Sequence, residues 1–320
     1  MYDCYDTIII GGGPVGLFGA YYACLRDMSV KLIDSRSELG GQISAIYPEK
    51  WVYDIPGIPA IRGKELFENL KKQFKPYNIP VSLNEEVILI RKNRNNILCI
   101  TTKSLKVFHA KTAILCVGMG AHMPRKLAID NMQEYEGKGI HYGVKSLEDF
   151  RNKKIIVLGG GDSALDLALT VAEVSSEISL AHRSDRFNAH EETVKKLYSS
   201  NIEIKTFSEL ASIDGDEAHL RKVSLRNKKT SQITEMDKDE IIVAICLLFN
   251  LESMNEWGIE MEDNCIKVDD KRETSIPGLF AAGDICTYPA KMKLIGAGTS
   301  EIMQAIHHSK VYIQENFPYL

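Results

Sequence analysis

The sequence predicts an α/β fold with two Rossmann-like dinucleotide-binding domains, the second inserted in the first. Two stretches of the sequence predict this fold. In the first, 7–16, a β-branched strand leads into a glycine-rich turn, and the same pattern returns at 154–164. In both, glycines spaced as GxGxx(G/A) separate a buried strand from a helix, an arrangement that holds a pyrophosphate at the helix N-terminus. We place the first domain at residues 1–117 and 247–320 and the second at 118–246.

The first fingerprint contains Gly11, Gly13 and Gly16, with Pro14 at the start of the helix. The first glycine allows a tight turn, the second lets the backbone approach a pyrophosphate, and the third lets the helix lie close to the strand. The strand that follows, 30–33, ends in Asp34. We expect its carboxylate to accept hydrogen bonds from ribose hydroxyl groups.

The segment after Asp34 is rich in glycine and proline, so we expect an irregular loop there. A long loop beside a nucleotide cleft is where ligand contacts are common. Gln42 could donate a hydrogen bond to a ring carbonyl, and Tyr47 could stack on a flat heterocycle. The alternative for Tyr47 is a place in the core. Residues 63–74 have apolar positions at helical spacing and are expected to form a scaffold helix.

Strands are expected at 81–90 and 97–102, and a further buried strand at 113–117 precedes Gly118. The chain then becomes polar and irregular at 122–125. We expect it to cross into the second domain near this point.

The second fingerprint supplies Gly160, Gly161 and Ser163 as candidate nucleotide contacts. Its second strand, 177–181, ends in His182-Arg183 rather than in a carboxylate, and Arg186 lies just behind. An acid at this position repels a ribose 2′-phosphate, whereas an arginine accommodates one. The pattern therefore favours NADPH over NADH, and the alternative is a solvated basic loop.

The remaining strands are expected at 202–207, 223–225 and 241–245, followed by a buried strand at 278–284. That strand ends in Asp284, which is placed to hold ribityl or phosphate groups of the first cofactor. The turn before Thr299 then opens a last helix. Its N-terminus could stabilise negative charge on a reduced flavin ring.

Composition narrows the function classes. A pI near 6.1 and a net charge of -4 argue against a nucleic-acid partner. The longest apolar run, 241–249, is far shorter than the ~20 residues of a membrane helix. No signal-peptide pattern precedes the first strand, so a cytoplasmic protein is expected. The seven cysteines form neither CxxC nor a metal-ligand spacing, so we expect reduced, buried thiols and no metal site.

The motifs GGGPVG, GGQ with YPEK, GGGDSALD, HRSDRF and AAGDICTY together resemble the thioredoxin-reductase-like flavoproteins, specifically their ferredoxin-NADP reductase branch. The resemblance covers nearly the whole chain. It implies FAD at the first fingerprint, NADPH at the second, and a homodimer.

The resemblance also implies roles for individual residues. Asp34 would hold the FAD ribose, Gln42 and Tyr47 would meet the flavin ring, and Asp284 would bind the ribityl side. Val87 and Met123 would pack on the cofactor, and Thr299 would belong to the same site. No side chain is expected to act as a catalytic acid or base.

Three departures from the family pattern matter. Tyr142 and Lys145 stand where thioredoxin reductases carry CxxC, so thioredoxin reduction is not expected. Ser184 and Asn188 replace two arginines of the usual NADPH loop, which softens the expected preference for NADPH. Relatives often cover one flavin face with a ring beyond the last helix, and here Phe317 and Tyr319 are the candidates for that role.

The function implied by the resemblance is transfer of hydride from NADPH to FAD, then of single electrons to ferredoxin or flavodoxin. An NAD(P)H oxidase or quinone reductase on the same scaffold is one alternative. A flavin redox sensor with low turnover is the other. Lys50, Lys64, Lys71 and Lys72 are candidates for a patch that binds an acidic carrier protein.

Overall fold

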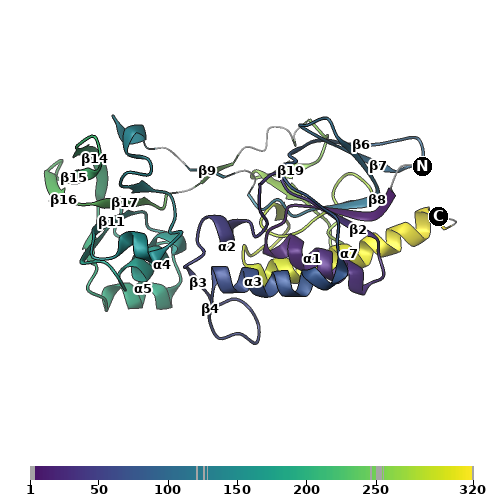
Figure 1. Ribbon diagram of the computed structural model, residues 1–320, viewed down its shortest axis with the longest axis horizontal. Coiled ribbons are helices and arrows are strands. Elements are labelled where there is room, and N and C mark those ends of the chain that lie inside the picture. Colours follow the sequence, from purple (N-terminus) through teal and green to yellow (C-terminus); the bar gives the residue numbers. More distant parts are fainter. Residues whose placement is uncertain are drawn as a thin grey trace. The chain divides into compact units, whose positions relative to one another are not determined.

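The computed structural model describes residues 4–119, 122–124, 127, 129–245, 247–249, 254 and 256–318, with the backbone alone at 122–124 and 247–249. It forms two compact units, coloured along the chain in Figure 1. Unit 1 contains 1–45, 52–122 and 249–320, and unit 2 contains 46–51 and 123–248. The chain therefore passes between the units four times, and the short segment Ile46–Trp51 groups with unit 2.

Unit 1 is built on a sheet with the strand order β5-β2-β1-β8-β7-β6, in which β21 also pairs with β8. The pairs among β5, β2, β1, β8 and β21 are parallel, and β8-β7-β6 is an antiparallel meander. The strands are β1 Cys4–Ile10, β2 Val30–Ile33, β5 Val81–Ser82, β6 Val87–Lys92, β7 Leu98–Thr102, β8 Val107–Leu115 and β21 Leu279–Ala281.

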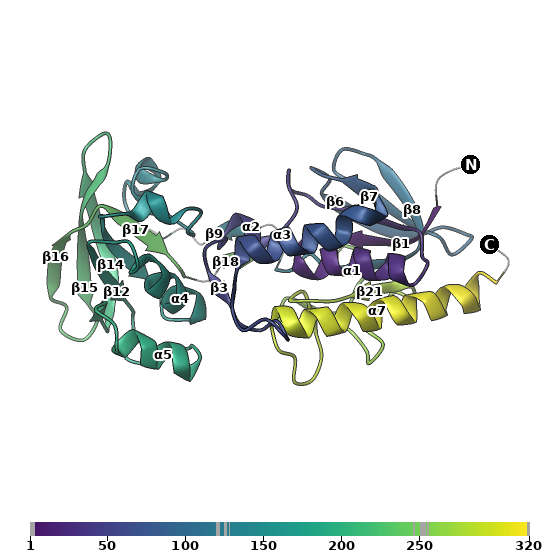
Figure 2. The same ribbon diagram turned by 60° about the horizontal axis from the view of Figure 1, so that its bottom comes forward.

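Helices cover one face of this sheet. Its helices are α1 Pro14–Leu25, α2 Gln42–Ala45, α3 Gly63–Phe74, η1 Lys75–Tyr77 and α7 Ile295–Asn316. Helix α1 packs between α3 and α7 (Figure 2). Because side chains alternate along a strand, Ile9 joins the core under these helices while Ile8 and Ile10 join the core on the opposite face. The sheet is thus buried on both faces, as parallel strands require.

Unit 2 repeats this design with a parallel sheet of order β10-β17-β11-β12-β13. Its elements are η2 Met132–Tyr135, β10 Ile140–His141, η3 Leu147–Phe150, β11 Lys154–Leu158, α4 Asp162–Val171, β12 Glu177–Ala181, α5 Glu191–Tyr198, β13 Glu203–Lys205 and β17 Glu240–Val243. Beside this sheet lies an antiparallel sheet of β14 Ser208–Gly215, β15 Leu220–Asn227 and β16 Ile233–Asp237. Two cores again lie on opposite faces of β11.

Short ladders complete the fold. They pair β3 Trp51–Val52 with β4 Ile61–Arg62, β9 His122–Pro124 with β18 Leu247–Phe249, and β20 Cys265–Lys267 with both β19 Met261–Glu262 and β22 Cys286–Thr287. Within the residues described, no helix is long and apolar enough to cross a membrane.

The predicted α/β fold with two parallel sheets is confirmed. The strand predicted at 81–90 is wrong, because the chain leaves the extended path between β5 and β6. There the buried carboxylate of Glu85 accepts hydrogen bonds from Thr102, Ser104 and Lys106, which fixes a turn. The sheet β14–β15–β16 was predicted only at 223–225, because its exposed strands carry many charged residues.

Candidate functional site

The turn after β1 has the shape expected of a phosphate-binding loop. Gly11 has a φ of +108°, and a Cβ there would overlap the carbonyl oxygen of Cys116, while one on Gly16 would overlap that of Gly11. Only glycine fits at these two positions. Helix α1 begins at Pro14, and its N-cap residue, Gly13, supplies no side-chain hydrogen bond to the first turn. Its first N–H groups therefore remain available to an anion.

The space in front of Gly13 is lined by bare backbone. The nearest atom to a Cβ on Gly13 would be the α-carbon of Gly41, at 3.9 Å. Gly41 has a φ of +58°, and the neighbouring Gly40 N–H donates to the carbonyl of Gly12 at 2.8 Å. These two glycine turns therefore form a cradle that side chains leave open, and it fits a pyrophosphate group.

Asp34 lies at the end of β2, 7% exposed. Its two carboxylate oxygens accept hydrogen bonds from the N–H groups of Gly12, at 2.5 Å, and Arg36, at 2.8 Å. Burial raises the pKa of Asp34, and these two backbone hydrogen bonds oppose the shift. Each oxygen retains a lone pair, so the carboxylate can still accept from a ribose hydroxyl.

The residues predicted to meet the flavin fall in different units. Gln42 begins α2 in unit 1, and its Nε2 would lie 3.9 Å from a Cβ on Gly118. Tyr47 belongs to unit 2, within Ile46–Trp51. Val87 packs partly buried against the unit 1 core. The side chain of Met123 lies outside the described residues.

Asp284 follows β21 at a turn where Gly283 has a φ of +84°. Burial raises its pKa, and the positive charges of Lys291 and Lys293 oppose the shift. Within the described residues, no hydrogen bond to its carboxylate is observed, so this acid can accept from a ligand hydroxyl. Nearby, Thr299 lies in the first turns of α7, where its hydroxyl donates to the carbonyl of Ile295 at 2.9 Å.

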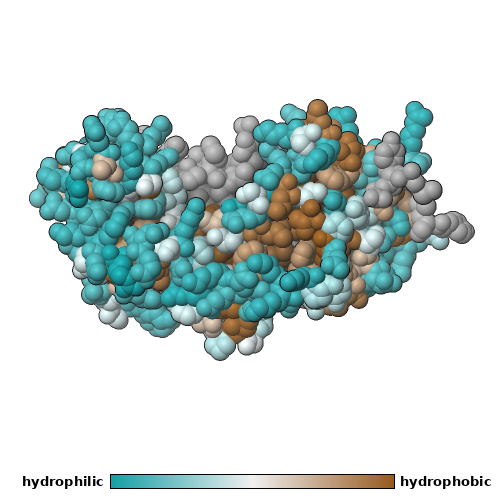
Figure 3. Space-filling view, viewed as in Figure 1, coloured by the Kyte–Doolittle hydropathy of each residue, from teal (hydrophilic) through white to brown (hydrophobic). Residues whose placement is uncertain are grey.

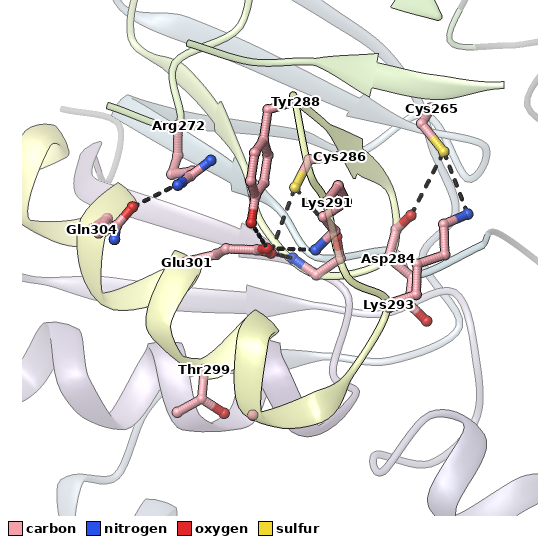
Figure 4. Close-up of polar contacts among 12 residues, drawn as sticks. Cys265, Arg272, Asp284, Cys286, Tyr288, Lys291, Lys293, Thr299, Glu301 and Gln304 are labelled. Carbon is pink, nitrogen blue, oxygen red and sulfur yellow. Dashed lines mark hydrogen bonds and ion pairs between the residues drawn. The ribbon is translucent and has the colours of Figure 1, made fainter. Parts of the chain in front are cut away.

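A buried carboxylate that the sequence analysis missed organises the turn carrying Asp284. Glu301 of α7 is 2% exposed and accepts from the Gly283 N–H at 2.8 Å, the Tyr288 hydroxyl at 2.6 Å and the Lys291 ammonium at 2.5 Å (Figure 4). The Cys286 thiol approaches the same carboxylate at 3.6 Å. Burial raises the pKa of this thiol to about 12. One side chain therefore ties the whole turn to α7. No spacing rule connects position 301 with these partners, so only the fold could identify it.

The second fingerprint repeats the first in unit 2. Gly159 has a φ of +152°, and α4 begins after Gly161, which supplies no side-chain cap. The backbone N–H of Asn188 donates to the carbonyl of Gly160 at 2.8 Å, so the loop after β12 folds back over the fingerprint. Ser163 lies exposed in the first turn of α4.

His182 packs its ring against the α-carbon of Gly160, where no other residue would leave room. The ring lies 3.0 Å from the Ser184 hydroxyl and is stacked on Phe187. Burial lowers the pKa of His182, and the charge of Arg183 lowers it further. The imidazole is therefore neutral at neutral pH.

Arg183 and Arg186 are both exposed. Neither guanidinium makes a hydrogen bond or ion pair with the part of the chain that the structure describes. Both are therefore available to a phosphate group.

Tyr142 and Lys145, which the resemblance aligns with the CxxC of thioredoxin reductases, carry no thiol. The hydroxyl of Tyr142 donates to Glu136 at 2.9 Å, and the six described cysteines are unpaired. The expectation that the thiols are buried is wrong for Cys4, which is exposed, and for Cys24 and Cys99, which are partly exposed. Among the described residues, no group of side chains could hold a metal ion.

Comparison with known proteins agrees with this geometry. The family model for pyridine nucleotide-disulphide oxidoreductases matches residues 5–309. The chain is 42% identical to ferredoxin--NADP reductase of Geobacillus thermodenitrificans, over 97% of this chain and 93% of the relative. It is also 42% identical to ferredoxin--NADP reductase 2 of Listeria welshimeri, with the same coverage.

Solved structures show the same fold. The thioredoxin reductase of Lactococcus lactis in its FR conformation superposes with a TM-score of 0.85 at 28% identity, over 97% of this chain and 99% of that one. The T. acidophilum thioredoxin reductase gives the same TM-score at 23% identity, over 97% and 98% of the two chains. With two glycine cradles on two parallel sheets and a family match across nearly its whole length, the chain belongs to the pyridine nucleotide-disulphide oxidoreductase family.

Proposed function

We propose that this protein is a ferredoxin-NADP reductase that binds FAD in unit 1 and NADPH in unit 2. Two relatives with this name share 42% of their residues with it over nearly the full chain. One observation supports the choice of branch: in the resemblance, Tyr142 and Lys145 stand where thioredoxin reductases carry the CxxC dithiol. Without a thiol relay, the acceptor must take electrons directly from the flavin.

We assign the FAD contacts to the open cradle and its two acids. The pyrophosphate lies against Gly13 and the N-terminus of α1, Asp34 binds the ribose, and Asp284 binds the ribityl chain. When bound, FAD would accept a hydride and release its two electrons one at a time. The protein orients the group and excludes water.

We assign NADPH to Gly161, Ser163 and the N-terminus of α4, with Arg183 and Arg186 on the 2′-phosphate. The exposure of both guanidinium groups supports this. Because only these two arginines are present in the loop, we expect a moderate preference over NADH.

The acceptor is an acidic carrier, ferredoxin or flavodoxin. Helix α3 and the following turn carry four lysines, Lys64, Lys71, Lys72 and Lys75, against two glutamates. Lys50, which was also predicted to join this patch, is only 18% exposed and is paired with Asp166, so we leave it out. Lys71 pairs with Glu68 but stays 48% exposed. A patch with net positive charge favours docking of an oppositely charged partner.

We also propose a homodimer that acts in the cytoplasm. Exposed hydrophobic residues gather over unit 1 (Figure 3). On α1, the partly exposed rings of Phe18, Tyr21 and Tyr22 adjoin Leu25, which is 51% exposed. A second copy would bury this face, and Leu25→Glu should then shift the mass measured by light scattering to that of a monomer. A wild-type monomer would contradict the dimer.

The unpaired thiols fit a reducing compartment.

A coupled assay tests the function. NADPH-dependent reduction of cytochrome c should be slow without a carrier and fast with ferredoxin. It should fall as ionic strength rises to about 0.5 M, since exposed charges are screened over ~10 Å at 0.1 M. Fast turnover with oxygen or quinone that ferredoxin does not increase would identify an oxidase or quinone reductase. No turnover with any acceptor would identify a redox sensor.

A further inference from the structure

The segment Ile46–Trp51 is attached to unit 2 by its backbone. It follows α2 of unit 1 and returns to unit 1 at Val52, yet it clusters with unit 2. The N–H of Val144 donates to the carbonyl of Ile46 at 3.2 Å. A Cβ on Gly143 would overlap that same carbonyl, so the two chains touch along their backbones.

An ion pair attaches the other end of the segment. The ammonium of Lys50 lies 2.9 Å from the carboxylate of Asp166, and the two side chains are 18% and 19% exposed. Asp166 lies on α4, the helix that begins at the second glycine fingerprint. Because both groups are partly buried, dissolved salt screens this pair less than it would screen a surface pair.

The same ammonium also faces the ring of Tyr47. The Nζ atom of Lys50 lies 5.4 Å from the ring centroid, within the range of a cation–π contact. Asp166, Lys50 and Tyr47 therefore form a chain of three contacts. A carboxylate on the nucleotide-binding helix of unit 2 orients the ammonium, and the ammonium orients the ring.

We propose that Asp166, acting through Lys50, is a positioning residue that holds Tyr47 on unit 2. This rests on the proposed function, in which unit 1 binds FAD, and on the expectation from the resemblance that Tyr47 meets the flavin ring. Under it, the ring expected to meet the FAD is ordered in part by the ion pair of Lys50 and Asp166.

Two measurements on full-length Asp166→Asn test the proposal. Amide hydrogen exchange in 46–51, measured without FAD, should rise about three- to fivefold, because loss of the pair frees one end of the segment. The fluorescence of bound FAD, compared at equal occupancy, should rise, because a Tyr47 that is no longer held in place stacks less on the flavin and quenches it less. Asp166→Glu should restore both. The reversed pair, Lys50→Asp with Asp166→Lys, should restore the exchange alone, because it removes the ammonium that faces Tyr47.

Two further variants separate positioning from general destabilisation. In Tyr47→Leu, the Asp166→Asn change should have no additional effect on flavin fluorescence. Lys222→Ala removes an exposed ion pair with Glu235 in the same unit and should leave both measurements at wild-type values.

Unchanged exchange in 46–51 would show that the pair of Asp166 and Lys50 does not hold this segment. Raised exchange with unchanged fluorescence would show that the pair does not position Tyr47. A chain that takes up no FAD would contradict the proposed function instead, and the exchange measurement would still test whether the pair holds this segment.

Discussion

Arg183 is the residue on which the choice of nucleotide rests. It lies two residues after the end of β12, and its exposed guanidinium has no partner among the described residues. Losing a charge-assisted contact to a 2′-phosphate costs about 1.5–3 kcal/mol, roughly ten- to a hundredfold in affinity. Arg183→Ala should therefore raise the KM for NADPH by that factor and leave the KM for NADH unchanged. Arg221→Ala, on β15, is the control, and an equal rise for both nucleotides would make Arg183 structural.

Glu301 is the residue that holds the Asp284 turn in place. Glu301→Gln keeps the shape but leaves the ammonium of Lys291, whose side chain is 6% exposed, without its counter-charge. Breaking a buried pair from one side costs about 3–5 kcal/mol. We therefore expect a lower midpoint of thermal unfolding and weaker FAD binding, measured by titration of the apoprotein. Adding Lys291→Met should restore part of the stability.

Glu315→Gln changes an exposed carboxylate on the same helix and is the matched control. Wild-type FAD affinity in a folded Glu301→Gln protein would show that the turn does not need this anchor.

Residues differ in how far the sequence could identify them. Asp34 was predictable because it follows a strand at a fixed distance from the glycines, and the structure turns its carboxylate to Gly12. Glu301 and Asp166 were not, because their partners are set by tertiary packing. The contact of Tyr47 with the flavin was predicted from its loop and stays a prediction. The ion pair that attaches this loop to unit 2 could not be predicted, because it joins residues far apart in the chain.

The glycine turn between β1 and α1 gives a prediction at the scale of an element. Gly13 has a φ of -72°, which alanine adopts, and a Cβ there would meet nothing closer than 3.9 Å. Gly13→Ala should fold with wild-type stability yet bind FAD weakly, because the methyl group enters the phosphate cradle. Gly16→Ala should instead destabilise the protein, because its methyl group would overlap the carbonyl of Gly11. Thermal unfolding and FAD titration would separate the two, and equal FAD affinity in Gly13→Ala and the wild type would contradict the cradle.

Elements with a clear apolar period were predicted well, and polar ones were not. The bounds of β2 and α3 coincide with the predictions at 30–33 and 63–74, because both carry a regular hydrophobic pattern. Strands β14 and β16 lie largely exposed, so their sequences lack the buried run that identified β1 and β11. Their position is fixed by pairing with β15, and this pairing cannot be recognised from the sequence.

At the scale of the molecule, electron transfer should not depend on cysteine. The seven thiols are scattered, and burial raises the pKa values of Cys116 and Cys286, so these two stay protonated at neutral pH. A variant with all seven replaced by alanine should keep ferredoxin reduction, while losing stability of about 1 kcal/mol for each buried site. Loss of activity in a variant that still folds and binds FAD would contradict this and would show that thiols carry the electrons.

The most direct test follows the electrons through one protein. After anaerobic mixing with NADPH, the visible flavin band of the FAD-loaded protein should bleach. Subsequent mixing with oxidised ferredoxin should restore the band, with two ferredoxins reduced for each NADPH consumed. A protein that takes up no FAD would contradict the account. So would a bleached band that ferredoxin leaves unchanged and thioredoxin restores.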